Sequence, residues 1–329
     1  MIRRHIIMGA TLATLALASC GGGDDDPTPT PSPTATPTPT PTASPTYATF
    51  PLAGAVEFNT INAATSYTGD PAAGAVTLGV ASTESFSSRV RLATSNAIAT
   101  ATYVIRENVE ESRFVNANVS VQPSPAVSEF VFRTIDAATA GKFSQLEFLN
   151  NSIPSQVTSD ASLALTNVSY ANWWRGDSTT GAKRITTSVF GYQTALTDMP
   201  TTGTQAYASR VVGRLVSVTG AASSVLSVSG TVTTSVNFST GLVDMTLNLT
   251  TIPAAGGAPV TYGTFTAQGA IPVGQNQFTG SFTTGSPLSG TVAGGFFGSQ
   301  GKEIGITFAA SGTIGGANQR LVGVVVGKK

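Results

Sequence analysis

The sequence predicts an all-β protein, in which an irregular antiparallel β domain precedes a soluble eight-stranded antiparallel β-barrel. Two observations lead to this class. Gly, Thr, Ser, Ala and Val dominate the 329 residues, and this composition favours strands and turns over long helices. In the last third of the chain, apolar residues alternate with polar residues along short runs that Gly-rich turns separate.

The clearest strand pair lies near the end of the chain. Residues 289–298 and 302–308 form two runs that face each other across the turn Ser299-Gln300-Gly301. In the second run, three apolar residues point one way and two polar residues point the other way, as in a half-buried strand. These are Ile304, Ile306 and Phe308 and, opposite them, Glu303 and Thr307. Glycines inside both runs indicate bends or close backbone approach, as at barrel corners.

Residues 1–19 are predicted to be a lipoprotein signal peptide and not part of the fold. Arg3 and Arg4 form a positive start, and the following apolar segment is too short to span a bilayer as a stable helix. The segment ends in Leu17-Ala18-Ser19-Cys20, which is similar to a bacterial lipobox. The alternative is an ordinary signal peptide with an incidental thiol.

We expect Cys20 to become the acylated N-terminus of the mature protein, which attaches it to the membrane through lipid. Gly21 and not Asp follows the cysteine, and in similar Gram-negative lipoproteins this favours the outer membrane. Residues 20–46 then form an acidic and Pro/Thr-rich tether without a core. The tether's Pro-Thr repeat, at about 3.1 Å per residue, would reach roughly 60 Å if fully extended.

Residues 47–200 contain strand-like runs without a regular spacing, and a short helix is possible within residues 82–100. From about residue 201 to residue 329 the pattern becomes regular and predicts eight strands joined as a meander. These are residues 204–217, 224–238, 242–250, 260–268, 276–284, 289–298, 302–311 and 319–327. Eight such strands can close into a barrel that side chains fill, and closure removes exposed sheet edges.

The barrel is not expected to span a membrane. Aromatic residues make up only 8% of the chain, and no aromatic girdles flank the strands. The last residues are Gly327-Lys328-Lys329, where outer-membrane barrels usually carry a terminal aromatic residue.

Three stretches together resemble the transferrin-binding protein B-like surface lipoproteins. The first is Phe296-Phe297-Gly298 with Glu303, Gly305 and Phe308, which leads to the Gly-flanked strand at residues 323–327. The second is residues 190–194 followed by Pro200, Gly203 and Tyr207, and the third is residues 165–174. The resemblance covers most of residues 140–329.

This resemblance implies a handle domain, residues 47–200, followed by a barrel domain, residues 201–329, displayed by lipid at the outer-membrane surface. Members of the family hold host iron proteins, haem proteins or complement regulators, and some act as co-receptors for a TonB-dependent importer. This chain has one handle-plus-barrel unit where the family pattern has two. We therefore carry over a solute-binding or co-receptor role for a host or environmental partner, and not transferrin itself.

The sequence indicates no enzyme, cofactor or metal site. His5, in the signal segment, is the only histidine, and Cys20 is the only cysteine. This excludes His- or Cys-based catalysis, His or Cys metal sites and His-ligated haem in the mature protein. The 17 basic and 17 acidic residues balance, so no field for nucleic acid is expected. Oligomeric state and ligand identity stay open.

Glu107, Glu110 and Glu111 are the best candidates for a catalytic carboxylate pair. Arg106 and Arg113 accompany them, so we expect a solvated charged turn and not an acid–base pair.

Trp173, Trp174 and Arg175 form the candidate ligand-binding edge. Adjacent residues of a strand face opposite sides, so one Trp is expected in the core and the other outside it. Trp and Arg are frequent anchors of interfaces. The alternative is that the outward Trp packs between the handle and the barrel.

The sequence therefore predicts a non-catalytic, lipid-anchored surface protein that captures a ligand or partner, as in iron or other nutrient acquisition. Three alternatives remain: a structural or adhesive envelope lipoprotein, a carboxylate-based hydrolase, and a small lipid carrier resembling a lipocalin. The last requires an open apolar cavity, where we predict a filled barrel.

Overall fold

The computed structural model describes residues 44–329 except 85–87, 94–97, 123, 125, 140, 153–158, 178 and 254–255. The predicted signal peptide, Cys20 and most of the predicted tether lie outside the described residues. Residues Ser44–Lys329 form one compact unit. The boundary between residues 200 and 201 stays a prediction.

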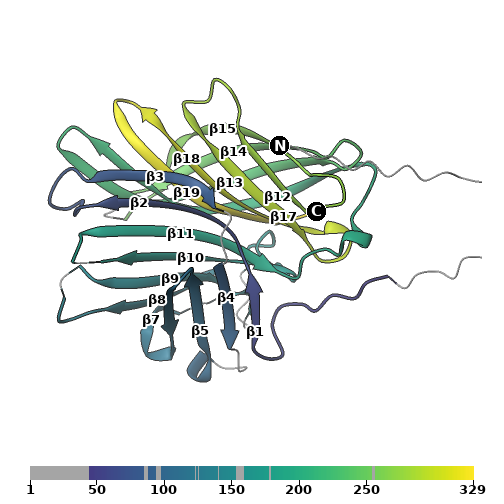
Figure 1. The fold of residues 1–329 in the computed structure, drawn as a ribbon, viewed down its shortest axis with the longest axis horizontal. Coiled ribbons are helices and arrows are strands. Elements are labelled where there is room, and N and C mark those ends of the chain that lie inside the picture. Colours follow the sequence, from purple (N-terminus) through teal and green to yellow (C-terminus); the bar gives the residue numbers. More distant parts are fainter. Residues whose placement is uncertain are drawn as a thin grey trace, which may run out of the picture. The chain divides into compact units, whose positions relative to one another are not determined.

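Two antiparallel sheets precede the barrel (Figure 1). The four-stranded sheet has the order β1-β4-β5-β6, with β1 Val56–Asn59, β4 Ser88–Ala93, β5 Thr102–Glu107 and β6 Glu110–Phe114. The seven-stranded sheet has the order β3-β2-β11-β10-β9-β8-β7. Its strands are β2 Ile61–Thr68, β3 Thr77–Glu84, β7 Val119–Val121, β8 Glu129–Ile135, β9 Phe143–Leu149, β10 Val168–Gly176 and β11 Ala182–Gly191.

The possible helix within residues 82–100 is wrong for the described part of that segment. β3 continues to Glu84, β4 occupies Ser88–Ala93, and the single 3-10 turn η1 covers Ile98–Thr100. The backbone of β4 pairs with both β1 and β5, so the ladder satisfies its hydrogen bonds on both sides. Long-range pairing thus overrides the unclear local pattern.

The eight predicted barrel strands are confirmed. They are β12 Thr204–Thr219, β13 Ala222–Asn237, β14 Leu242–Ile252, β15 Val260–Ala270, β16 Gln277–Phe282, β17 Leu288–Phe297, β18 Glu303–Ile314 and β19 Ala317–Lys328. Each strand pairs antiparallel with the next, and β12 pairs with β19 to close the barrel.

The barrel has two ends. The proximal end carries the loops at residues 238–241, 271–276 and 298–302, together with the 3-10 turns η4 (Leu196–Asp198) and η5 (Ser299–Gly301), and lies to the right in Figure 1. The distal end carries the loops at residues 220–221, 253–259, 283–287 and 315–316.

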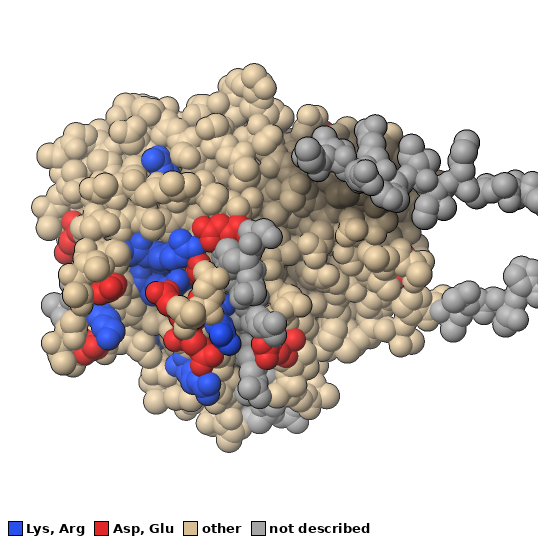
Figure 2. All heavy atoms as spheres, viewed as in Figure 1, with Lys and Arg blue, Asp and Glu red and all other residues tan. Residues whose placement is uncertain are grey.

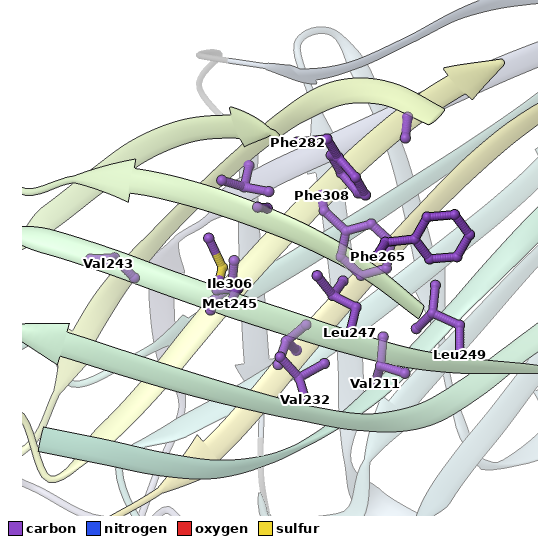
Figure 3. Packing of buried hydrophobic residues seen from close by; sticks show 14 of the residues in the cluster. Val211, Val232, Val243, Met245, Leu247, Leu249, Phe265, Phe282, Ile306 and Phe308 are labelled. Atoms are coloured by element: carbon purple, nitrogen blue, oxygen red, sulfur yellow. The ribbon is translucent and has the colours of Figure 1, made fainter. Parts of the chain in front are cut away.

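Apolar side chains fill the barrel interior (Figure 3). Val228, Val232 and Val236 of β13 are buried there, while the neighbouring Thr231 and Thr233 are exposed. This order is opposite to that of outer-membrane barrels, whose apolar residues face outward. The cluster of buried apolar side chains inside the barrel is as predicted, whereas a lipid carrier requires an open cavity there. No helix of the described residues is long and apolar enough to cross a membrane.

The central strands of the seven-stranded sheet are buried on both faces, as the burial of consecutive residues in β10 and β11 shows. One face packs against the four-stranded sheet around Phe130, Phe148 and Trp173. The other face packs on the outside of the barrel through two clusters that join Val168 and Val189 to Val324, and Ile185 to Val322. These contacts hold both sheets and the barrel in one body.

Gly305 and Glu303 of β18 lie at this contact between the sheet and the barrel. A Cβ at Gly305 would stand 2.9 Å from a methyl group of Val168, so the glycine permits the close approach that the sequence indicates. The Glu303 carboxylate accepts hydrogen bonds from the backbone N–H groups of Asn167 and Val168, at 2.7 and 2.9 Å.

Candidate functional site

A pocket of about 730 Å³ opens where the seven-stranded sheet meets the hairpin of β5 and β6. We call it the charged pocket. Its lining combines charged, hydroxyl and aromatic side chains. They include Glu110, Glu111, Ser112, Asp136, Lys142, Phe143, Ser144, Trp173, Arg175, Lys183 and Arg184. The last residues of β8 and β10 and the first residues of β9 and β11 contribute, so the pocket lies at one end of the sheet.

The charged pocket lies far from the proximal end of the barrel. β10 starts at Val168, whose N–H bonds to Glu303 next to η5, and it ends at Gly176 in the pocket. Nine residues of extended strand span about 30 Å. The described chain begins at the opposite end, because the Tyr47 hydroxyl donates to Asp198 Oδ2 (2.8 Å) and accepts from the Ala195 N–H (2.9 Å) beside η4.

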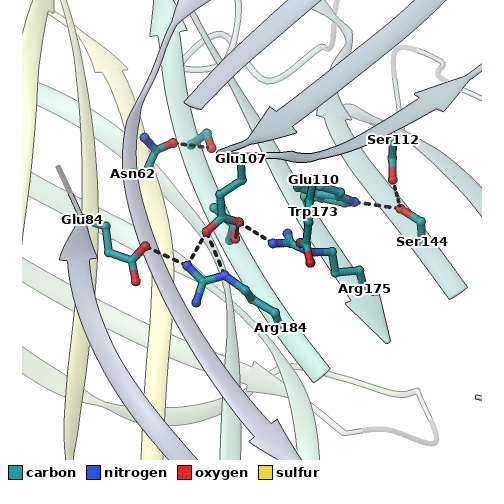
Figure 4. A network of polar contacts seen from close by, with 11 residues as sticks. Asn62, Glu84, Glu107, Glu110, Ser112, Ser144, Trp173, Arg175 and Arg184 are labelled. Carbon is teal, nitrogen blue, oxygen red and sulfur yellow. Dashed lines mark hydrogen bonds and ion pairs between the residues drawn. The ribbon is translucent and has the colours of Figure 1, made fainter. Parts of the chain in front are cut away.

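The structure brings two of the three predicted edge residues together in the pocket. The Arg175 guanidinium lies over the Trp173 ring, 3.7 Å from its centroid, in a cation–π contact. Trp173 is buried, and its Nε1–H donates to Ser144 Oγ at 2.7 Å (Figure 4). Hydrogen bonding and packing therefore fix the position of the tryptophan below the arginine.

Trp174, the third predicted residue, lies on the other face of the sheet. It packs with Tyr67 and Ile185 in a cluster that includes barrel residues such as Val322. Its ring meets Phe143 edge-on, with centroids 5.2 Å apart. The alternation of the strand is thus confirmed, and Trp174 takes the position between sheet and barrel that we considered as the alternative.

Glu107 is the electrostatic centre of the site, and it comes from β5 in the other sheet. Its carboxylate accepts from Arg175 Nη2 (2.7 Å), Arg184 Nε (2.8 Å) and Thr186 Oγ1 (2.8 Å). Arg184 also pairs with Glu84 at 2.7 Å. Figure 4 shows the two guanidinium groups converging on the carboxylate. This network ties β3, β5, β10 and β11 together.

Burial alone would raise the pKa of Glu107, but the hydrogen bonds and charges of Arg184 and Arg175 outweigh it and lower the pKa. Burial likewise tends to lower the pKa of Arg184, yet Glu107 and Glu84 leave it raised. Glu107 is therefore an ionised group with all its acceptors engaged, and it is poorly suited to move protons.

The prediction of a solvated charged turn is wrong for Glu107, which is buried among its arginine partners. Glu110 fits the prediction better. Its side chain is 60% exposed and its carboxylate meets Arg175 Nε at 2.5 Å, so it forms the rim of the pocket. Glu111 pairs with Arg113 at 2.7 Å outside the network.

Charged side chains concentrate at this part of the molecule. On the face seen in Figure 2, Lys, Arg, Asp and Glu gather over the two sheets, while the barrel surface carries few of them. Charged residues are only 10% of the chain, so this concentration distinguishes the edge from the rest of the surface. Among the described residues no group of three or more His, Cys, Asp or Glu could hold a metal ion. The arrangement is suited to binding a polar partner with an aromatic or apolar part.

Sequence reasoning missed Arg184 and the role of Glu107. The two residues are 77 positions apart, and nothing in one sequence pairs them. The available signal was weak: Lys183 and Arg184 precede an otherwise uncharged strand-like run at residues 185–192.

Comparison with known proteins gives matches in structure only. No family model matches the chain, and no curated protein matches its sequence. A transferrin-binding protein B double mutant from Haemophilus parasuis Hp5, described as a vaccine antigen, matches with a TM-score of 0.36 and 13% identity, covering 85% of this chain and 78% of that one. Isotype 1 transferrin-binding protein B from serogroup B Neisseria meningitidis matches with a TM-score of 0.41 and 14% identity, covering 82% of this chain and 43% of that one. Structures of transferrin-binding protein B thus match most of this chain at low identity.

Proposed function

We propose that the protein is a non-catalytic, lipid-anchored outer-membrane protein that binds a partner at the charged pocket on the cell surface. One observation carries the proposal. The pocket with Trp173, Arg175 and Glu110 lies at the opposite end of the molecule from Tyr47, where the described chain begins. A tether that starts at an acylated Cys20 would hold the proximal end near the membrane and present the pocket outward.

The chemistry of the pocket supports binding. Arg175 is held by Glu107, Glu110 and the Trp173 ring, so its guanidinium is fixed before a partner arrives. A preorganised side chain loses less conformational entropy on binding. An arginine at the centre of an interface commonly supplies much of the binding energy, and the buried Trp173 ring supports Arg175 from below.

We further propose that the partner belongs to a nutrient-uptake system, with this protein acting as a co-receptor beside a TonB-dependent importer. The support is the sequence resemblance, together with the lipobox and the tether. A tether confines the pocket near membrane receptors and so raises its effective concentration there.

The experiment is a pull-down from iron-starved culture with the acylated full chain. The variants are Arg175→Lys, which keeps the charge but loses the planar fork, and Arg113→Lys as the matched control. Arg113 is 70% exposed and pairs with Glu111 outside the network around Glu107. We expect to recover a partner with the unaltered protein. Arg175→Lys should reduce the recovered amount of this partner at least tenfold, and Arg113→Lys should leave it unchanged.

A second arm uses a chain that lacks residues 1–46. This shortened chain should still bind the partner in solution, but membrane receptors should no longer be recovered together with it. If the same proteins are recovered with every variant, the pocket is not the binding site, and the structural or adhesive alternative gains.

A further inference from the structure

The proximal end of the barrel carries exposed apolar side chains on neighbouring loops. Leu196 of η4 is 56% exposed, Leu242 at the start of β14 is 40% exposed, and Val273 is fully exposed at 102%. Around them Met199, Phe238 and Ile271 pack partly buried against the barrel core. Single exposed apolar residues need no explanation, but a group at one rim does.

Leu196 and Val273 line a groove, and Leu242 follows directly after its lining residue Gly241. A groove of about 300 Å³ is lined by η4 and by the loops at residues 238–241 and 271–275. The Ile271 N–H donates to the Gly241 carbonyl at 2.8 Å, which joins the two loops. We call Leu196, Leu242 and Val273 with this groove the apolar rim.

The described chain begins beside the apolar rim. Tyr47 contacts Ala195 and Asp198, the residues on either side of the segment that carries Leu196. Only 23 residues separate Cys20 from Ser44. Whatever Cys20 is attached to therefore lies within reach of the apolar rim.

Charge also distinguishes the two ends of the barrel. Lys302 and Lys329 are exposed at the proximal end, and Lys329 Nζ donates to the Gln300 carbonyl at 2.7 Å. The distal loops at residues 220–221, 253–259, 283–287 and 315–316 contain no charged residue. Apolar side chains and lysines at the same end of the barrel suit the boundary between headgroups and acyl chains of an anionic bilayer.

We infer that the apolar rim docks onto the lipid surface that holds Cys20, so that the barrel stands on the membrane by its proximal end. This inference rests on the proposed lipid anchor. It adds that the barrel touches the bilayer and does not hang freely from the tether. The anchor supplies the affinity, and the rim needs only a weak contact because the tether keeps it close.

The test uses the acylated full chain in vesicles of phosphatidylethanolamine and phosphatidylglycerol. Val273→Cys introduces the one free thiol, because Cys20 is the only native cysteine and is acylated. A polarity-sensitive fluorophore on this thiol reports insertion, and brominated lipid quenches it. Val260→Cys is the matched control, since Val260 is a 56% exposed valine at the distal end.

We expect at least threefold stronger quenching at position 273 than at position 260. Leu196→Asp with Leu242→Asp should abolish the difference while the protein still floats with the vesicles. Equal quenching at both positions with normal flotation would overturn the docking and leave the anchor intact. Loss of flotation would overturn the anchor and the docking together. A blue shift without vesicles that grows with protein concentration would assign the rim to a second copy of the chain instead.

Discussion

The Glu303 carboxylate of β18 caps the start of β10 by accepting the backbone N–H of Asn167 at 2.7 Å. It also accepts the N–H groups of Thr166 and Val168, at 2.8 and 2.9 Å. One buried side chain of the barrel thus satisfies three backbone donors of the adjoining sheet. Without it these donors would be buried and unpaired, which is costly.

Replacing Glu303 by Ala should therefore destabilise the protein by about 2–4 kcal/mol, because several buried N–H groups lose their acceptor. Glu303→Gln should cost less, since its amide oxygen can still accept. Urea unfolding measures both changes, with Glu111→Gln as the exposed control. A midpoint for Glu303→Ala equal to that of the control would contradict the role of the cap.

Gly305 should tolerate no side chain, because Val168 and Val189 of the adjoining sheet fill the space where a Cβ would stand. Gly305→Ala is expected to reduce the free energy of unfolding by about 1–3 kcal/mol through overpacking. Gly54→Ala is the control, since no atom lies within 4 Å of its added Cβ. The same unfolding temperature for both variants would show that the sheet and the barrel are not tightly packed at Gly305.

Glu129 predicts a pH dependence of stability. Burial, followed by the charge of Glu147, raises its pKa to about 7, although Arg214 and a hydrogen bond from Tyr170 act in the opposite direction. The folded state therefore keeps a proton that the unfolded state loses near the ordinary value of 4.5. This contribution to stability is complete below about pH 4.5 and is lost as the pH rises through about 7.

The loss should amount to about 3–4 kcal/mol, because the pKa rises from 4.5 to about 7 and each pKa unit corresponds to roughly 1.4 kcal/mol. Glu129→Gln keeps a neutral side chain at every pH, so its unfolding free energy should fall less over this window. Urea unfolding at several pH values gives the slope of the unfolding free energy against pH for the unaltered protein and for Glu129→Gln. Identical slopes would mean that Glu129 does not hold its proton in the folded protein.

Glu107 joins Arg175 and Arg184, so its removal leaves two largely buried guanidinium groups without their shared partner. Glu107→Ala should cost about 3–5 kcal/mol, as expected when one member of a buried ion pair is deleted. Glu110→Gln should cost less than about 1 kcal/mol, because that carboxylate is mostly in water. Calorimetric unfolding measures the loss of stability in both variants. An equal loss would contradict the claim that Glu107 holds the network together.

The barrel could be predicted from sequence because its signal is local. Val228, Val232 and Val236 alternate with polar neighbours, and short turns connect strands that pair in order. The sheets before it are harder to predict, because several of their strands pair out of order and the central strands of the larger sheet bury both faces. β1 pairs with β4, and β2 pairs with β11.

The candidate site was only partly predictable for the same reason. Strand alternation predicted that Trp173 and Trp174 face opposite sides, and the structure has them in different clusters on the two faces of the sheet. Glu107, the partner of Arg175, lies 68 positions away in the sequence, so its burial could not be foreseen from the charged turn in which it lies. The alternation with Ile304 and Ile306 predicted that Glu303 points out of the barrel. The backbone groups that bury it and bond to it lie 135 or more positions away in the sequence.

The measurement that tests the binding claim most directly is site-specific photo-crosslinking in iron-starved cells. A photoreactive residue replaces Glu110 on the rim of the charged pocket, and in a second strain it replaces Thr264, exposed on the barrel strand β15. We predict a discrete crosslinked product from position 110 that disappears with Arg175→Lys and is absent from position 264. The same product from both positions, or one from position 264 alone, would contradict a partner-binding role for the pocket.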